Sequence, residues 1–297
     1  MLGANEKKKT FGLLGRNISY SLSPVMHNAA FSYFNIPAEY KLFDIGEEHL
    51  DEFLRDALEL RNVNGFNVTV PYKVRVREFI SGDKRHRLDE SAFQLGAVNT
   101  VSMEEGSMLG YNTDGRGFWE SVKDEIGIEG INNIFVFGAG GASRAICSYL
   151  VSPSGCKTLN TVYVYDIDDK KIRSLEELIN KEASCRKLVP VDRQDIPVKV
   201  TECELLVNAT PLGTKEGDPP PFDPGLIGTG IAVYDLVYAR ETEIVKTARS
   251  AGSRAAGGLG MLINQGAVAF NIWTGMPLDE VKKVMREAVY GKIRGDK

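Results

Sequence analysis

The stretch IFVFGAGGASRAI, residues 134–146, is the strongest indication of fold in this chain. A short apolar strand runs directly into a glycine-rich turn, and a helical pattern follows at once. Gly138 permits the tight turn, and Gly140 lets the backbone approach a pyrophosphate at the positive end of the helix dipole. Ser143 stands where the third glycine of the G-x-G-x-x-G pattern falls, and it is small enough for close helix packing. The stretch predicts a dinucleotide-binding turn, with a ligand-free glycine-rich connection as the alternative.

Strand-like and helix-like patterns alternate on both sides of this stretch, which predicts an α/β protein with largely parallel sheets. The chain has 297 residues, more than the about 100–200 of a usual domain, so we expect two α/β domains. The first comprises residues 1–112 and is completed by residues 265–297, while residues 113–264 form a doubly wound, Rossmann-like domain. We expect the C-terminal helices to pack back on the first domain.

Composition points to an ordinary globular protein that acts on small molecules. Hydrophobic residues make up 43% and charged residues 26%, with a net charge of −4 and a pI of about 5.6, so nothing favours nucleic acid or an anionic membrane. No stretch approaches the about 18 apolar residues of a spanning helix, and the start does not resemble a signal peptide. The cysteines are widely spaced and are expected to be reduced thiols in the cytoplasm: Cys147, Cys156, Cys185 and Cys203. The histidines are equally scattered, so no metal site is expected.

A second informative stretch is GFNVTVPYK, residues 65–73. Phe66, Val68 and Val70 alternate with polar residues in a predicted buried strand, and a proline then prevents further pairing. Lys73 therefore lies just beyond a strand end, where a lysine is usually a solvated surface residue. The stretch alone leaves open whether Lys73 is such a residue or transfers a proton.

Polar clusters follow other predicted strands of the first half, at SYSLSP (19–24), GAVNTV (96–101) and GYNTDG (110–115). Each has a structural explanation by itself. Ser23 is expected to open a helix as its N-cap, with Pro24 in the first turn. The asparagine and aspartate residues of the other clusters are typical of turns.

Taken together with NVTVPYK, GAGGAS, NAT and GLGMLINQ, these clusters stand in the order and at about the spacing found in shikimate dehydrogenases, which reduce 3-dehydroshikimate in aromatic biosynthesis. The chain resembles this family over roughly residues 10–285. The resemblance implies that the first domain binds the substrate and the second binds NAD or NADP. It also implies that Lys73 and Asp114 form the catalytic pair, because hydride transfer to a ketone requires delivery of a proton.

The resemblance further implies a site for a carboxylate that bears several hydroxyl groups. Ser21 and Ser23 are expected to hold the carboxylate, with Tyr238 beside the substrate. Other polar side chains would bind the hydroxyl groups: Thr69, Asn99 and Gln265. The cofactor would contact the glycine turn, the NAT segment and a later glycine: Gly138, Ala139, Gly140, Gly141, Ala142, Asn208, Ala209, Thr210 and Gly258.

Asp166 sets this chain apart from the common family pattern. Relatives that prefer NADP usually carry an Asn-Arg-Thr/Ser stretch after the second strand of the nucleotide domain, but this chain has VYVYDIDDKK. Asp166 lies at about the spacing expected for an acidic residue that binds the adenosine ribose, and it would repel a 2′-phosphate. We therefore expect a preference for NAD, with NADP, the family default, as the alternative. Lys170, Lys171 and Arg173 could neutralise a phosphate, or Asp166 could simply cap the next helix.

The predicted function is that of a shikimate dehydrogenase, acting as a monomer or homodimer on a small-molecule substrate. The first alternative is a dehydrogenase that accepts both quinate and shikimate. The second is a non-catalytic ligand-binding paralogue, which the presence of Lys73 and Asp114 disfavours.

Overall fold

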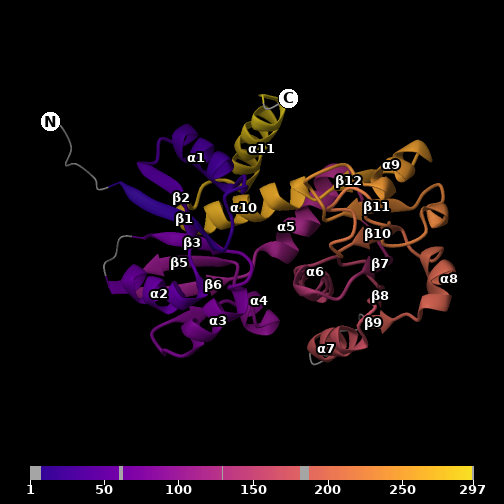
Figure 1. The fold of residues 1–297 in the computed structure, drawn as a ribbon, viewed down its shortest axis with the longest axis horizontal. Coiled ribbons are helices and arrows are strands. Elements are labelled where there is room, and N and C mark those ends of the chain that lie inside the picture. Colours follow the sequence, from indigo (N-terminus) through magenta and orange to yellow (C-terminus); the bar gives the residue numbers. More distant parts are fainter. Residues whose placement is uncertain (1–7, 60–62, 129, 181–186, 296–297) are drawn as a thin grey trace. The chain divides into compact units, whose positions relative to one another are not determined.

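The computed structural model describes residues 8–59, 63–128, 130–180 and 187–295. The chain divides into two compact units, the first formed by Met1–Thr113 and Gln265–Lys297 and the second by Asp114–Asn264. Both units are α/β, as the sequence predicts (Figure 1). Within the described residues, no helix is both long and apolar enough to cross a membrane.

The first unit is built on a mixed sheet with the strand order β2-β1-β3-β5-β6-β4. Strands β1, β2 and β3 run parallel, whereas β5 is antiparallel to both β3 and β6. The expectation of largely parallel sheets is confirmed, with β5 as the antiparallel strand of this half. Its elements are β1 (Lys9–Gly15), α1 (Ser23–Tyr33), β2 (Ala38–Asp44), η1 (Glu47–His49), α2 (Leu50–Glu59), β3 (Gly65–Val68), α3 (Lys73–Ser81), β4 (Arg87–Leu88), α4 (Glu90–Leu95), β5 (Thr100–Glu104), β6 (Ser107–Tyr111), the end of α10 (Leu259–Thr274) and α11 (Leu278–Gly295).

Helices cover both faces of this sheet. Phe66 and Val68 of β3 belong to an apolar core that includes buried side chains of α2, α3 and α4. On the opposite face, Phe11 of β1 stacks on Phe31 of α1 and contacts Trp273 of α10. Helix α11 packs against α1, which confirms that the C-terminal helices return to the first unit (Figure 1).

The second unit holds a parallel sheet with the strand order β12-β11-β10-β7-β8-β9, the doubly wound arrangement of nucleotide-binding domains. The order reverses between β7 and β10, which pair directly. Its elements are α5 (Asp114–Ser121), the π-helical turn η2 (Val122–Ile126), β7 (Asn133–Phe137), α6 (Gly141–Val151), β8 (Thr161–Tyr165), α7 (Asp169–Asn180), β9 (Lys187–Pro190), η3 (Arg193–Asp195), α8 (Ile196–Val200), β10 (Leu205–Asn208), η4 (Pro224–Leu226), β11 (Ala232–Asp235), α9 (Glu243–Ser250), β12 (Ala255–Gly257) and the start of α10.

Two apolar cores enclose this sheet, as a sheet buried on both faces requires. One lies under α5, α6 and α7, and the other under α8 and α9. The nearly unbroken apolar run of β7 follows from this double burial, because Ile134 and Val136 face one core and Phe135 and Phe137 face the other.

Candidate active site

The glycine turn joins three strands of the second unit at their carboxyl ends. Gly138 has a φ of +100°, and a Cβ there would lie 2.9 Å from the carbonyl oxygen of Ala209. Its N–H donates to the carbonyl of Tyr165 at the end of β8 (2.7 Å), and the N–H of Ala209 donates to Phe137 at the end of β7 (2.8 Å). Only glycine allows both this backbone conformation and this close approach. The turn and the NAT segment after β10 therefore meet at the point where the strand order reverses, which is where ligands bind in such sheets.

Helix α6 begins at this turn without a side-chain cap. Gly140 occupies the N-cap position in an extended conformation, and Ser143 in the first turn is completely buried. A helix start that lacks a capping side chain leaves its N–H groups available for an anion. The predicted strand, turn and helix are confirmed, and Ser143 fits in the packed space expected for the third glycine.

Asp166 follows β8 and lies directly against the glycine turn. Its Oδ2 accepts a hydrogen bond from the N–H of Ala139 (2.7 Å), and its Oδ1 accepts one from the N–H of Asp168 (2.9 Å). The cap of the next helix is Asp168, whose Oδ1 accepts from the N–H of Lys170 (3.0 Å). Asp166 is therefore not the helix cap, and its carboxylate is fixed beside the turn.

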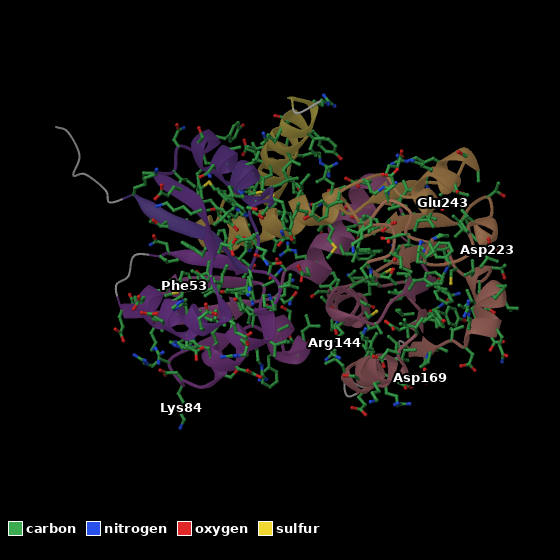
Figure 2. The ribbon with its side chains drawn as sticks, in the orientation of Figure 1. Phe53, Lys84, Arg144, Asp169, Asp223 and Glu243 are labelled. Atoms are coloured by element: carbon green, nitrogen blue, oxygen red, sulfur yellow. The ribbon has the colours of Figure 1, made fainter. Side chains whose placement is uncertain are left out.

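A cationic hollow adjoins the same turn. It is lined by Ala139, Gly140 and Gly141, by Arg144 and by residues of α7: Lys170, Lys171 and Ser174. Arg144 donates through Nη1 to Ser174 Oγ (2.9 Å), and burial lowers the pKa of its guanidinium. Figure 2 marks the two helices that form the hollow, α6 by Arg144 and α7 by Asp169. The hollow combines helix N–H groups with positive charge, a setting suited to phosphate.

Asp235, at the end of β11, orients the NAT segment through a hydrogen bond from Asn208. Its Oδ1 accepts from Asn208 Nδ2 (2.9 Å) and from the N–H of Val237 (3.0 Å), and its Oδ2 accepts from the Thr242 hydroxyl (2.6 Å). The carboxylate is completely buried, and this burial raises its pKa. Sequence reasoning missed Asp235, although an acidic residue at the end of an apolar strand was visible.

Gly258 lies close to the end of β11. A Cβ at this position would overlap the carbonyl group of Leu236, and the Gly258 N–H donates to the carbonyl of Val237 (3.1 Å). The residues expected to bind the cofactor thus lie around the carboxyl ends of β7, β8, β10 and β11 within one unit. Their roles remain predictions.

In the first unit, the two serines expected to hold a carboxylate lie between β1 and the start of α1. The prediction that Ser23 is the N-cap is wrong, because Leu22 takes that position and Ser23 is already helical. Ser21 Oγ instead accepts the Ser23 N–H (3.2 Å), and the two hydroxyl oxygens are 3.1 Å apart. Helix α1 begins one residue earlier than predicted, with Pro24 in its first turn, a position that suits proline. Leu22 therefore occupies the N-cap position, while the Ser21 side chain accepts the Ser23 N–H.

Strand β3 ends sooner than the alternation predicted. It stops at Val68, and Val70 is 65% exposed. The Thr69 N–H donates to the carbonyl of Leu14 in β1 (2.9 Å), and Lys73 becomes the first residue of α3. This helix was not predicted from the sequence. A short turn leads from Val68 directly into α3, so the strand-like alternation of apolar and polar residues beyond Val68 does not correspond to a strand.

Asn99 lies at the same end of this sheet. Its N–H donates to Tyr111 at the end of β6 (3.0 Å), and its carbonyl accepts from Val68 at the end of β3 (2.8 Å). Lys73 is tied to this segment, because its carbonyl accepts the N–H of Val98 (2.9 Å). The structure therefore brings Lys73, Thr69 and Asn99 together at one end of the first unit.

The remaining predicted residues are divided between the units. Gln265 belongs to the first unit, whereas Asp114, the first residue of α5, and Tyr238, which is 41% exposed, belong to the second. The pairing of Lys73 with Asp114 thus stays a prediction. Among the described residues, no group of three or more histidine, cysteine, aspartate or glutamate side chains is placed to hold a metal.

Family models and relatives agree on one family. The model of the shikimate dehydrogenase substrate-binding domain matches residues 13–101, and that of the shikimate 5′-dehydrogenase C-terminal domain matches residues 258–290. A curated relative from Methanococcus maripaludis strain C7, named shikimate dehydrogenase (NADP(+)), is 36% identical over 97% of this chain and 98% of its own length. The chain belongs to the shikimate dehydrogenase family.

Two solved structures that are similar to this chain were determined with bound ligands. Shikimate 5-dehydrogenase from Listeria monocytogenes, in complex with shikimate and NAD, is 29% identical with a TM-score of 0.82, covering 94% of this chain and 96% of that chain. Quinate dehydrogenase from Corynebacterium glutamicum, in complex with NAD, is 30% identical with a TM-score of 0.81, covering 94% of this chain and 99% of that chain. The fold is therefore shared by enzymes named for shikimate and for quinate.

Proposed function

We propose that this protein is a shikimate dehydrogenase, which reversibly reduces 3-dehydroshikimate to shikimate with NAD(P)H in the pathway to chorismate and the aromatic amino acids. The observation that carries the proposal is the match of the chain to a curated shikimate dehydrogenase over 97% of its length. The sequence also contains both members of the expected catalytic pair. Those members are Lys73 and Asp114. A binding protein without catalysis would not need to keep them.

The chemistry assigns a proton to Lys73. When bound, the nicotinamide cofactor supplies or accepts the hydride. As shikimate is oxidised, its hydroxyl proton passes to the Lys73 amine, and in the reverse direction Lys73 returns that proton to the oxygen. Asp114 orients Lys73 and accepts a hydrogen bond from a substrate hydroxyl.

The other polar residues orient the substrate in this proposal. Ser21 and Ser23 donate to the carboxylate, with Tyr238 as a further contact. Thr69, Asn99 and Gln265 bind ring hydroxyls. Neutral donors suit this task, because they hold an anion without leaving a buried cation unpaired when the substrate departs.

The cofactor is proposed to bind along the glycine turn, with Asp166 accepting hydrogen bonds from the adenosine ribose. Two backbone N–H groups hold the Asp166 carboxylate at the turn, which supports a preference for NAD. NADP is the second candidate. It is supported by the name of the Methanococcus relative and by the cations of the nearby hollow, Arg144, Lys170 and Lys171.

Quinate is a second candidate substrate, supported by the structural likeness to quinate dehydrogenase. We also propose that the enzyme acts in the cytoplasm as a monomer or homodimer. The three cysteines described, Cys147, Cys156 and Cys203, are free and buried, which is in keeping with a reducing compartment. Cys185 lies outside the described residues.

The test is a set of initial-rate assays at the absorbance band of the reduced nicotinamide. Shikimate and quinate are each supplied with NAD and with NADP. The proposal predicts turnover of shikimate with at least one cofactor and a higher kcat/KM than for quinate. No absorbance change in any of the four combinations would overturn it in favour of a non-catalytic paralogue.

A further inference from the structure

A row of hydrogen-bonded side chains leads through the first unit to Asn99, one of the residues proposed to bind a ring hydroxyl. The Tyr40 hydroxyl in β2 donates to Asn67 Oδ1 in β3 (2.7 Å), and Asn67 Nδ2 donates to Thr100 Oγ1 in β5 (3.0 Å). The Thr100 hydroxyl donates in turn to Asn99 Oδ1 (3.0 Å). The row ends where Asn99 Nδ2 donates to Thr113 Oγ1 (3.0 Å).

These side chains are shielded from solvent. None of the five is more than 4% exposed, so water does not compete for their hydrogen bonds. Burial raises the pKa of Tyr40 well above its usual range, so the hydroxyl at the start of the row keeps the proton that it donates. The strand register explains the path, because Asn67 of β3 lies opposite Thr100 of β5 in the antiparallel pair.

Backbone groups fix the direction in which the row donates. The N–H of Thr113 donates to Asn99 Oδ1 (2.8 Å), so this atom of the Asn99 amide must be the oxygen. Asn67 Nδ2 also donates to the backbone carbonyl of Asn99 (3.4 Å), so this atom of the Asn67 amide must be the nitrogen. The Thr100 hydroxyl accepts from Asn67 Nδ2, and its single proton is therefore directed to Asn99 Oδ1.

The Asn99 amide is thus held at both of its polar atoms. Two donors, the Thr113 N–H and the Thr100 hydroxyl, occupy the lone pairs of Oδ1, while Thr113 Oγ1 accepts from Nδ2. The backbone of Asn99 is fixed as well, because its N–H donates to Tyr111 and its carbonyl accepts from Val68. An amide held in this way can meet a ring hydroxyl only through Nδ2, as a hydrogen-bond donor.

We propose that Thr100 and Thr113 are positioning residues for the substrate: they hold the Asn99 amide so that its nitrogen, and not its oxygen, faces a ring hydroxyl. This inference rests on the proposed function, which assigns a ring hydroxyl to Asn99. An amide nitrogen carries two hydrogens, so Nδ2 can donate both to Thr113 and to the substrate. Removing the Thr100 hydroxyl takes one donor from Oδ1, and the amide can then turn away from the orientation that suits the substrate.

The test compares Thr100→Val with Thr100→Ser by the KM for shikimate and by kcat. Valine keeps the shape of threonine without its hydroxyl, whereas serine keeps the hydroxyl and loses the methyl group. Thr100→Val should raise KM about fivefold, the effect of losing roughly one buried hydrogen bond, with kcat within about twofold of wild type. Thr100→Ser should keep the wild-type KM. The reverse order of KM values would show that Thr100 serves packing alone and would overturn the inference.

Two further variants test whether Thr100 acts through Asn99. The double variant of Asn99→Ala and Thr100→Val should have the KM of Asn99→Ala, because no amide is left for the Thr100 hydroxyl to hold. Thr113→Val removes the acceptor of Asn99 Nδ2 and should also raise KM. This variant keeps the test valid if Thr100→Val does not fold.

Ser102→Ala is the matched control. Ser102 is also buried and lies two residues beyond Thr100 in β5, on the same face of the sheet but outside the row. This variant should keep the wild-type KM for shikimate. An active wild type whose KM is unchanged by both Thr100→Val and Thr113→Val would overturn this inference alone, as would KM effects of Thr100→Val and Asn99→Ala that multiply. A wild type without activity would overturn the proposed function and this inference with it.

Discussion

The two units position their polar residues in different ways. In the first unit, neutral side chains hydrogen-bond one another. Ser21 bonds Ser23, and a separate row runs from Tyr40 through Asn67, Thr100 and Asn99 to Thr113. In the second unit, buried or half-buried carboxylates take this role: Asp235 holds Asn208, and Asp166 holds the glycine turn at Ala139.

The difference follows from what each kind of group can do. A carboxylate only accepts, so it fixes N–H and O–H donors in one direction and gives a rigid frame. A hydroxyl can both donate and accept, so the Ser21 and Ser23 hydroxyls can turn their hydrogens toward an anion that arrives. The first unit is thus suited to a substrate that binds and leaves, and the second to a turn that keeps one shape. Each of the following variants tests one side of this contrast.

The largest effect is expected at Lys73, the cation among the proposed substrate residues of the first unit. Lys73→Ala should lower kcat by at least about 10²-fold, the scale of general acid–base catalysis, while KM for shikimate changes less. Asp114→Asn should act on the same step, so the double variant should lose little more than Lys73→Ala alone. Steady-state kinetics measure both. A Lys73→Ala enzyme with near-normal kcat and unchanged pH dependence would make Lys73 a surface residue.

Asp235 tests the rigid frame of the second unit. Asp235→Ala should lower the free energy of unfolding by about 2 kcal/mol, because it leaves buried donors of Asn208, Val237 and Thr242 unpaired. Asp235→Asn should cost less, since its Oδ1 can keep two of these bonds and the Thr242 hydroxyl can turn to accept from Nδ2. Urea unfolding of the three proteins provides the comparison. Equal losses for the two variants would contradict the role of the carboxylate as an acceptor.

The pH dependence at Asp235 has a defined sign. Burial raises the pKa of Asp235 above the ordinary value of 3.8. Between pH 3.8 and the folded pKa, the folded state therefore binds more protons than the unfolded state. The contribution of Asp235 to stability is therefore full below pH 3.8 and is lost as the pH rises through the folded pKa. The stability of the wild type relative to Asp235→Asn should fall over this range and be constant above it. A relative stability that rises with pH would contradict the raised pKa.

Asp166 tests whether the frame also selects the cofactor. Asp166→Asn should shift the ratio of kcat/KM for NAD to that for NADP toward NADP by about tenfold, because a carboxylate near a 2′-phosphate is repelled. The wild type should prefer NAD. If the wild type strongly prefers NADP, or if Asp166→Asn leaves the NAD/NADP ratio of kcat/KM unchanged, the cations of the hollow rather than Asp166 would select the cofactor.

The smallest effect concerns the serine pair. Ser21→Ala removes the side-chain acceptor of the Ser23 N–H and should cost up to about 1 kcal/mol of stability, as other caps do. Ser23→Ala should lower the melting temperature less and raise KM for shikimate more. Thermal melts together with KM values separate the two. A larger fall in melting temperature for Ser23→Ala would return the capping role to Ser23.

Much of this architecture could be predicted from local sequence. The apolar run before Gly138 and the small Ser143 predict the nucleotide fold, because a buried parallel strand and a tight turn leave few alternatives. The sequence also showed the polar residues around Lys73 at the end of a predicted strand. What local patterns could not show was how residues distant in sequence combine.

Tyr40 and Asn67 illustrate this limit. Tyr40 alternates like any strand tyrosine, and Asn67 resembles a polar residue on an exposed strand face, yet α1 and α10 cover that face and bury both. The antiparallel pairing of β5 then brings Thr100 opposite Asn67. The mixed sheet and the helices that cover it are tertiary features, so no local pattern predicts the hydrogen bonds that join Tyr40, Asn67 and Thr100. The same reason explains why Asp235 was missed and the end of β3 was misplaced.

The most direct test of the account is a comparison of two Michaelis constants, for shikimate and for the preferred cofactor, in Ser23→Ala and Asp166→Asn. The account assigns the carboxylate of the hydroxy acid to the serine pair of the first unit and the nucleotide to the second unit. It predicts that Ser23→Ala raises the KM for shikimate about fivefold with an unchanged cofactor KM, and that Asp166→Asn changes the cofactor KM alone. The division between the units would be contradicted if Ser23→Ala changed only the cofactor KM and Asp166→Asn only the shikimate KM. Equal changes of both constants in both variants would contradict it as well.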